Sequence, residues 1–205
     1  MSVPALGAEL GAAVAEVEAQ TSVELIVLVA PRSGTYPETA WLGGLVGLYL
    51  AFAAVMFLDA ELGDSLIFTA PLAGLFAGAI LVAMSPGLQR LLASRAAIER
   101  NLELVARATF QKAGLAATRD ATALLVYLSW LERRAYIVAD RGVTRALAPP
   151  VLAKLESDFT ATLRAADPRG AILGATRSLG PLLAAALPPR ADDINELPDV
   201  IDVAF

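Results

Sequence analysis

The sequence predicts a small α+β sandwich, a mixed sheet flanked by helices, that is interrupted by a two-helix transmembrane hairpin. One observation is composition: 57% of the residues are hydrophobic, above the roughly 45–50% of soluble domains. The mean hydropathy of +0.61 points the same way. The others are two long uncharged segments and, outside them, short β-branched runs alternating with helical patterns. A chain of 205 residues has room for one domain plus an inserted anchor.

The uncharged segments predict the anchor. No charged residue occurs between Glu38 and Asp59 or between Asp64 and Arg90, and about 20 apolar residues suffice to cross a ~30 Å hydrocarbon core. We predict spans at about 41–58 and 66–84. The hairpin 41–84 then divides a discontinuous soluble domain of residues 1–35 plus 95–205. The alternative, a buried core hairpin, would leave too little other sequence to cover it.

Glycines recur at helical spacing in both predicted spans. Gly43 and Gly47 form one GxxxG pattern, and Gly74 and Gly78 form another. Such patterns let helices approach closely, so we favour packing within the hairpin, with homo-oligomerisation through the same faces as the alternative. The spans contain no Asp, Glu, Lys or Arg, which disfavours a transporter or channel.

Flanking charges predict the orientation. The connection 59–64 carries three acids and no base, whereas Arg32 precedes the hairpin and several arginines follow it, namely Arg90, Arg95, Arg100 and Arg107. By the positive-inside rule, the soluble domain and both termini face the cytoplasm of a multi-pass inner-membrane protein. The N-terminal residues lack the pattern of a signal peptide.

The soluble part reads as alternating helices and strands. An amphipathic stretch at 88–95 is expected near the membrane surface. Helices are predicted by apolar residues at helical spacing, and strands by β-branched runs. The predicted helices are 3 to about 19, 98–113, 143–147, 151 to about 165 and 171–187, and the predicted strands are 23–29, 123–129 and 135–139.

Composition also limits the chemistry. The chain has no Cys and no His, which excludes disulfides, thiol nucleophiles, imidazole bases and catalytic triads built on His. The formal net charge of -5 argues against nucleic acid as a partner, because binding phosphates requires a basic face.

Acidic residues offer one candidate metal site. Asp140 follows a predicted strand, and the C-terminal tail carries a cluster that consists of Asp192, Asp193, Asn195, Glu196 and Asp199. Oxygen ligands at this density suit Ca²⁺ or Mg²⁺, so the candidate ligands are Asp140, Asp192, Asp193 and Glu196. The alternative, which we favour, is a solvated tail. Glu132, Arg133 and Arg134 are interpreted as a solvated turn, with anion binding as the alternative.

Several short segments resemble the TPM domain family, named for thylakoid lumen, photosystem II repair and acetylcholine-receptor modulating proteins. They are 21–27, 110–115 with Thr118, 124–129, 132–133, 136–143 and 195–199, and they look like the bacterial membrane branch of the family. The resemblance implies a sheet flanked by helices. Some relatives bind calcium or have acid phosphatase activity, and others are accessory or assembly factors. Many relatives carry a signal peptide and a C-terminal anchor, whereas this chain has an internal hairpin.

These observations lead to two functional hypotheses. The first is a non-enzymatic, membrane-anchored interaction or assembly module, whose partners are the lipid bilayer and other membrane proteins and which binds a divalent cation if the acidic site is real. The second is a metal-dependent, acid-phosphatase-like hydrolase, in which a bound ion would supply the nucleophilic water.

Overall fold

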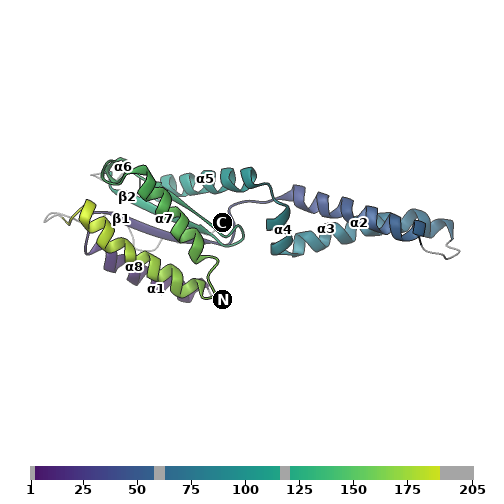
Figure 1. The fold of residues 1–205 in the computed structure, drawn as a ribbon, viewed down its shortest axis with the longest axis horizontal. Coiled ribbons are helices and arrows are strands. Elements are labelled where there is room, and N and C mark those ends of the chain that lie inside the picture. Colours follow the sequence, from purple (N-terminus) through teal and green to yellow (C-terminus); the bar gives the residue numbers. More distant parts are fainter. Residues whose placement is uncertain (1–2, 58–62, 116–120, 190–205) are drawn as a thin grey trace. The chain divides into compact units, whose positions relative to one another are not determined.

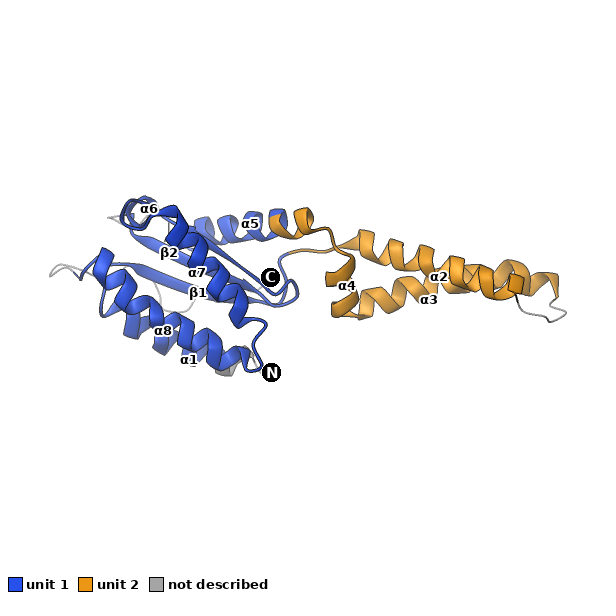
Figure 2. Cartoon of the chain, viewed as in Figure 1, with its two compact units in different colours: residues 1–33, 100–205 blue, residues 34–99 orange. Residues whose placement is uncertain are grey.

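The computed structural model describes residues 3–57, 63–115 and 121–189. The chain divides into two compact units (Figure 2), one formed by Met1–Ser33 with Arg100–Phe205 and the other by Gly34–Glu99. We call the first the sandwich unit and the second the hairpin unit, and we describe each by itself.

The sandwich unit is built on a three-stranded sheet (Figure 1). Its strands are β1 (Glu24–Ala30), β2 (Ala123–Ser129) and β3 (Arg134–Ala139), in the spatial order β1-β2-β3. β1 pairs with β2 in parallel, with Glu24 opposite Ala123. β2 pairs with β3 in antiparallel fashion, with Tyr127 opposite Tyr136. All seven residues of the central strand are buried, which explains its continuous apolar run.

Helices cover both faces of this sheet. They are α1 (Val3–Glu18), α5 (Arg95–Lys112), α6 (Arg141–Ala146), α7 (Pro149–Thr162) and α8 (Pro168–Ala186). One core joins a face of the sheet to α1, α7 and α8, and Phe159 is its largest fully buried side chain. The second core lies between the other face and α5 (Figure 1), where Phe110 meets Tyr127 and its neighbours. The predicted α+β sandwich is confirmed.

The hairpin unit consists of α2 (Pro37–Phe57), α3 (Asp64–Met84) and the short helix α4 (Pro86–Leu92). Both long helices have 21 residues and are apolar enough to cross a membrane, and only 11% and 6% of their most apolar windows are buried. Each helix begins a few residues before the predicted span. Pro37 suits a first helical turn because its φ is already fixed, and the carboxylate of Asp64 favours the positive end of a helix.

The remaining elements agree closely with the prediction. The helix predicted over 98–113 spans Arg95–Lys112, and Gly114 just beyond its end has a φ of +72° that glycine adopts without strain. α6 begins two residues before its predicted start because Asp140 caps it, its side chain accepting a hydrogen bond from the Arg141 amide. β3 gains Arg134, which pairs with Ser129 across the β2–β3 turn.

Candidate functional site

The β2–β3 turn is hydrogen-bonded to the last residue of β1 and to the residues that follow it, just before the hairpin unit begins. The amides of Trp130 and Leu131 donate to the carbonyls of Ala30 and Pro31, each at 2.9 Å. The amide of Ser33 donates to Glu132 Oε1 at 3.0 Å. The last residues of the sandwich unit before Gly34 are therefore fixed to the sheet by three successive bonds.

Glu132 is the centre of this arrangement. This residue is only 4% exposed. Its Oε2 accepts a hydrogen bond from the Ser129 hydroxyl. A buried carboxylate is costly unless donors surround it, and here a backbone amide and a hydroxyl meet that need. We call Ser33, Tyr127, Ser129 and Glu132 the junction cluster.

Tyr127 adds a second buried polar group to the junction cluster. Burial raises the pKa of its hydroxyl, and the nearby Glu132 charge raises it further, while Ser33 opposes both by lowering it. The Tyr127 hydroxyl and Ser33 Oγ are both buried, and neither makes a well-formed hydrogen bond within the described residues. The cluster is therefore a set of buried polar atoms at the start of the connection to the hairpin.

Sequence analysis did not predict this cluster. Glu132, Arg133 and Arg134 are predicted to form a solvated turn, yet only Arg133 of the three is exposed. Arg133 takes a φ of +49°, which allows the tight turn that directs Glu132 inward. The sequence feature that could have pointed to the cluster is a pair of small hydroxyl residues, Ser33 and Ser129, which both contact Glu132 in the structure.

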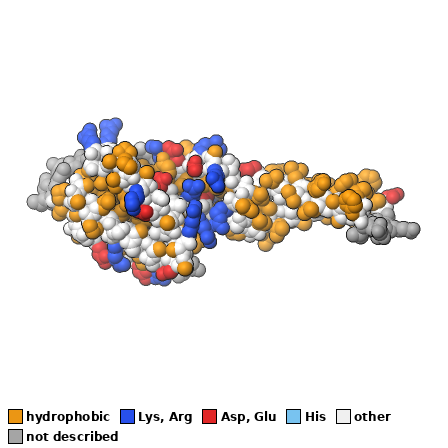
Figure 3. Space-filling view, in the orientation of Figure 1, with side chains coloured by type: hydrophobic (Ala, Val, Ile, Leu, Met, Phe, Trp, Pro, Cys, Tyr) orange, Lys and Arg blue, Asp and Glu red, His pale blue; other side chains and the backbone are white. Residues whose placement is uncertain are grey.

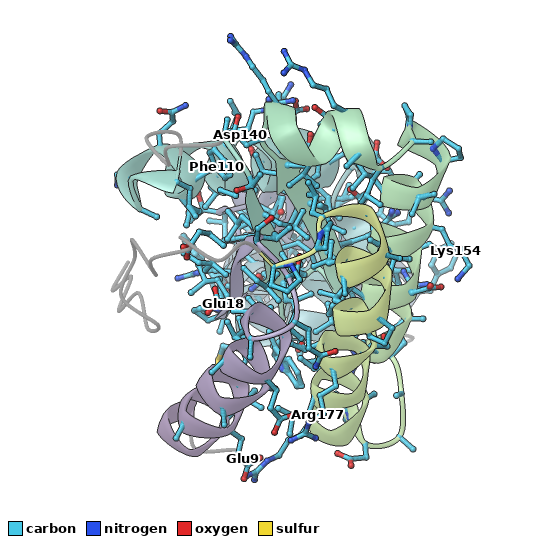
Figure 4. The ribbon with its side chains drawn as sticks, turned by 90° about the vertical axis from the view of Figure 1, so that its left-hand side faces the viewer. Glu9, Glu18, Phe110, Asp140, Lys154 and Arg177 are labelled. Carbon is cyan, nitrogen blue, oxygen red and sulfur yellow. The ribbon has the colours of Figure 1, made fainter. Side chains whose placement is uncertain are left out.

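Asp140, the first of the candidate metal ligands, lies where β3 ends and α6 begins (Figure 4). Its Oδ1 accepts from the Arg141 amide at 2.7 Å, and its Oδ2 is buried without a hydrogen-bond partner among the described residues. The other three candidates, Asp192, Asp193 and Glu196, lie outside the described residues. Within the described ranges no group of three or more acidic side chains is placed to hold a metal ion.

The glycines of α2 and α3 face one another inside the hairpin. A Cβ on Gly47 would lie 2.2 Å from the Gly74 carbonyl oxygen, and one on Gly78 would lie 2.2 Å from the Gly43 carbonyl oxygen. Both GxxxG faces are thus used in the contact between α2 and α3, as the favoured prediction of packing within the hairpin states. A homo-oligomer through the same faces would have to separate these helices.

The outer surface of the hairpin is apolar. Figure 3 shows hydrophobic side chains gathered along α2 and α3, and Trp41 and Phe76 are 69% and 64% exposed. α4 continues this surface, since Leu91 is 77% exposed while Arg90 lies in the last turn. So much contiguous apolar surface is typical of a protein that meets a membrane or another protein.

Comparison with known proteins adds information on the fold. Neither the protein-family models nor the curated proteins match this chain. Among solved structures, the chain is similar to the NMR structure of the BA42 protein from the psychrophilic bacterium Bizionia argentinensis, with 13% identity and a TM-score of 0.56. The match covers 96% of this chain and 91% of the other. At this identity the likeness shows a shared fold alone.

Proposed function

We propose that this protein is a membrane-anchored, non-enzymatic module that binds or helps to assemble other membrane proteins. The observation that carries the proposal is the exposed apolar surface of α2 and α3, two helices that contact each other through glycines and leave their large side chains outside. Lipid is the environment in which such an arrangement is stable.

The junction cluster supports a role that depends on attachment. Ser33 is the last residue before the hairpin unit, and its amide is tied to a buried carboxylate of the β2–β3 turn. These hydrogen bonds fix the residues that precede the membrane-anchoring hairpin to the sheet. The resemblance to accessory and assembly factors of the TPM domain family favours the same reading.

We place the sandwich unit and both termini on the cytoplasmic side of the inner membrane. The support is the charge asymmetry of the sequence, with arginines on the flanks of the hairpin and acids at its tip. A site for a divalent cation at Asp140 and the acidic tail remains part of the proposal, since carboxylate oxygens suit Ca²⁺ or Mg²⁺.

The absence of natural cysteines makes the orientation directly testable. Single-cysteine variants Asp64→Cys, at the hairpin tip, and Lys154→Cys, on α7, would be treated in intact cells with a membrane-impermeant maleimide. We expect labelling of position 64 in intact cells and of position 154 only after permeabilisation. Labelling of position 154 alone in intact cells would show the opposite orientation to the one proposed. Equal labelling of both positions would contradict a spanning hairpin.

The interaction role has its own test. The tagged full-length chain would be crosslinked in membranes of its native host, extracted in mild detergent and purified. We expect the same membrane protein to be recovered in every replicate, and the unmodified parent without a tag is the control. Consistent recovery of no protein above that control would count against an assembly module.

The buried and unpartnered Oδ2 of Asp140 favours a second candidate, the metal-dependent, acid-phosphatase-like hydrolase. This hypothesis requires turnover of a phosphomonoester that stops on chelation and in Asp140→Asn. The asparagine still offers a side-chain oxygen to cap α6, so loss of turnover would report on the charge. Activity that survives both treatments would exclude this mechanism.

A further inference from the structure

The two outer strands of the sheet differ in how their outward-pointing amides are used. In β3, the Ala135 amide donates to Thr160 Oγ1 at 3.0 Å, and the Ile137 amide donates to Glu156 Oε2 at 3.3 Å. Both acceptors come from α7, so this helix covers that edge of the sheet. A covered edge does not recruit another strand.

On the outer edge of β1, only the amide near the N-terminal end has a hydrogen-bond acceptor among the described residues. The Leu25 amide donates to Glu18 Oε1 at 2.9 Å, whereas the Ala30 carbonyl accepts from Trp130 on the β2 side. Because main-chain groups alternate between the two sides of a strand, Val27 and Val29 point outward with Leu25. In the described parts of the chain, no hydrogen-bond partner is found for these two amides.

The chain returns to this edge after its last helix. The carbonyl of Leu187 accepts from the Ser22 amide at 3.2 Å and from Thr21 Oγ1 at 2.6 Å, two to three residues before β1 begins. The described part ends at Pro189, two residues after this contact near the N-terminal end of β1, and 16 further residues follow in the sequence. A seven-residue strand such as β1 is about 23 Å long, and sixteen extended residues reach roughly 50 Å. The tail can therefore run along the whole edge in either direction.

The end of this tail has the composition of a strand. Residues 199–205 read Asp-Val-Ile-Asp-Val-Ala-Phe, with Ile201, Val203 and Phe205 on one side of an extended chain. β-Branched and aromatic residues are enriched in strands, and a proline such as Pro198 is tolerated just before one. On the face toward α5, Ile26 and Leu28 of β1 are only partly buried, so they offer apolar neighbours to an added strand.

We propose that residues 199–205 add to the free edge of β1 as a fourth strand and accept the hydrogen bonds of Val27 and Val29. The tail then protects the edge of its own chain as α7 protects the edge at β3. A second copy of the chain is the competing occupant, because an open edge also allows pairing between molecules.

Amide hydrogen exchange tests the proposal in the full-length protein in mild detergent and in a variant that ends at Pro189. We expect the Val27 and Val29 amides to exchange at least roughly tenfold faster in the truncated variant. The amides of Ala135 and Ile137 are internal references, because α7 binds them in both proteins, and their unchanged rates show that the sheet is intact. A peptide of residues 190–205 should restore slow exchange when it is added to the truncated variant.

Substitutions keep the test independent of truncation. Ile201→Asp with Val203→Asp should speed exchange at Val27 and Val29, whereas Asp192→Asn with Asp193→Asn, earlier in the tail, should not. Equal rates at Val27 and Val29 in the parent, the truncated variant and the Ile201/Val203 variant would overturn the proposal. Slow exchange that survives truncation but disappears on dilution would also overturn it, because it would assign the edge to a second copy.

Discussion

The hairpin unit and the sandwich unit bury opposite parts of their helices. In the sandwich, large side chains such as Phe159 and Leu179 lie inside, and the described charged residues other than Glu132 are at least partly exposed. In the hairpin, glycines lie inside the contact, and large side chains such as Phe76 lie outside. The difference teaches that each unit is arranged for its own surroundings. Water drives apolar side chains together, whereas lipid does not, so helices in lipid associate by close backbone approach.

Charge follows the same division. The sandwich holds a buried carboxylate at Glu132 because an amide and a hydroxyl donate to it. The hairpin has no Asp, Glu, Lys or Arg within residues 41–58 and 66–84, and the Thr69 hydroxyl there donates within its own helix to the Ser65 carbonyl. Predictions that change a matched residue in each unit can therefore break or sharpen this comparison.

The largest expected difference comes from the same substitution in both units. Phe159→Ala in α7 should lower the free energy of unfolding by about 3–5 kcal/mol, because it leaves a cavity in a core where Phe159 is 1% exposed. Phe76→Ala in α3, where the ring is 64% exposed, should change it by about 0.5 kcal/mol or less. Denaturant titration in detergent measures both. A similar loss in the two variants would mean that the hairpin is a buried core and not a membrane anchor.

The next effect is expected at the junction cluster. Glu132→Ala should cost about 2–3 kcal/mol of unfolding free energy, because the Ser33 amide and the Ser129 hydroxyl lose their acceptor in a buried place. Glu103→Ala, which removes an ion pair with Arg107 whose side chains are 45% and 61% exposed, is the matched control and should cost about 0.5 kcal/mol. Equal costs would show that Glu132 is in effect solvated, as its sequence neighbours suggest.

The spans, β2 and the junction cluster differ in how well the sequence predicts them. The spans and β2 could be predicted because local composition alone determines their type: long uncharged runs need lipid, and a continuous apolar strand needs cover on both faces. The junction cluster could not, because Ser33 and Glu132 are 99 positions apart and become neighbours only when β1 pairs with β2. Asp140 was placed correctly at a strand end, where an Asp before a short helix is expected to cap backbone amides, and its carboxylate does cap α6.

A smaller effect is expected from glycine substitutions in the two units. Gly47→Ala should destabilise the hairpin by about 1–3 kcal/mol, because the new methyl group would overlap the Gly74 carbonyl and push α2 from α3. Gly174→Ala in α8 meets no atom within 4 Å and should stabilise the sandwich by about 0.5–1 kcal/mol. Thermal unfolding in detergent measures the change in stability of each variant. Spin labels at positions 45 and 80 measure the distance between α2 and α3. An unchanged distance and midpoint in Gly47→Ala would show that the two helices do not rely on close approach.

The smallest effect is a dependence on alkaline pH that arises from two tyrosines of the sandwich unit. Burial raises the pKa of the Tyr127 hydroxyl in the folded protein, while in the unfolded chain its pKa is about 10. The folded state then retains a proton that the unfolded state releases, so the stabilisation is complete below about pH 10 and is lost as the pH rises toward the raised value. Tyr127→Phe should flatten the decline of unfolding free energy between pH 9 and pH 11, and Tyr136→Phe, whose hydroxyl pKa is also raised chiefly by burial, should flatten it as well. The labelled distance between α2 and α3 should stay constant over the same range, because neither hydroxyl lies in the hairpin unit. A slope that neither substitution changes would place the titrating group elsewhere and remove the alkaline difference between the two units.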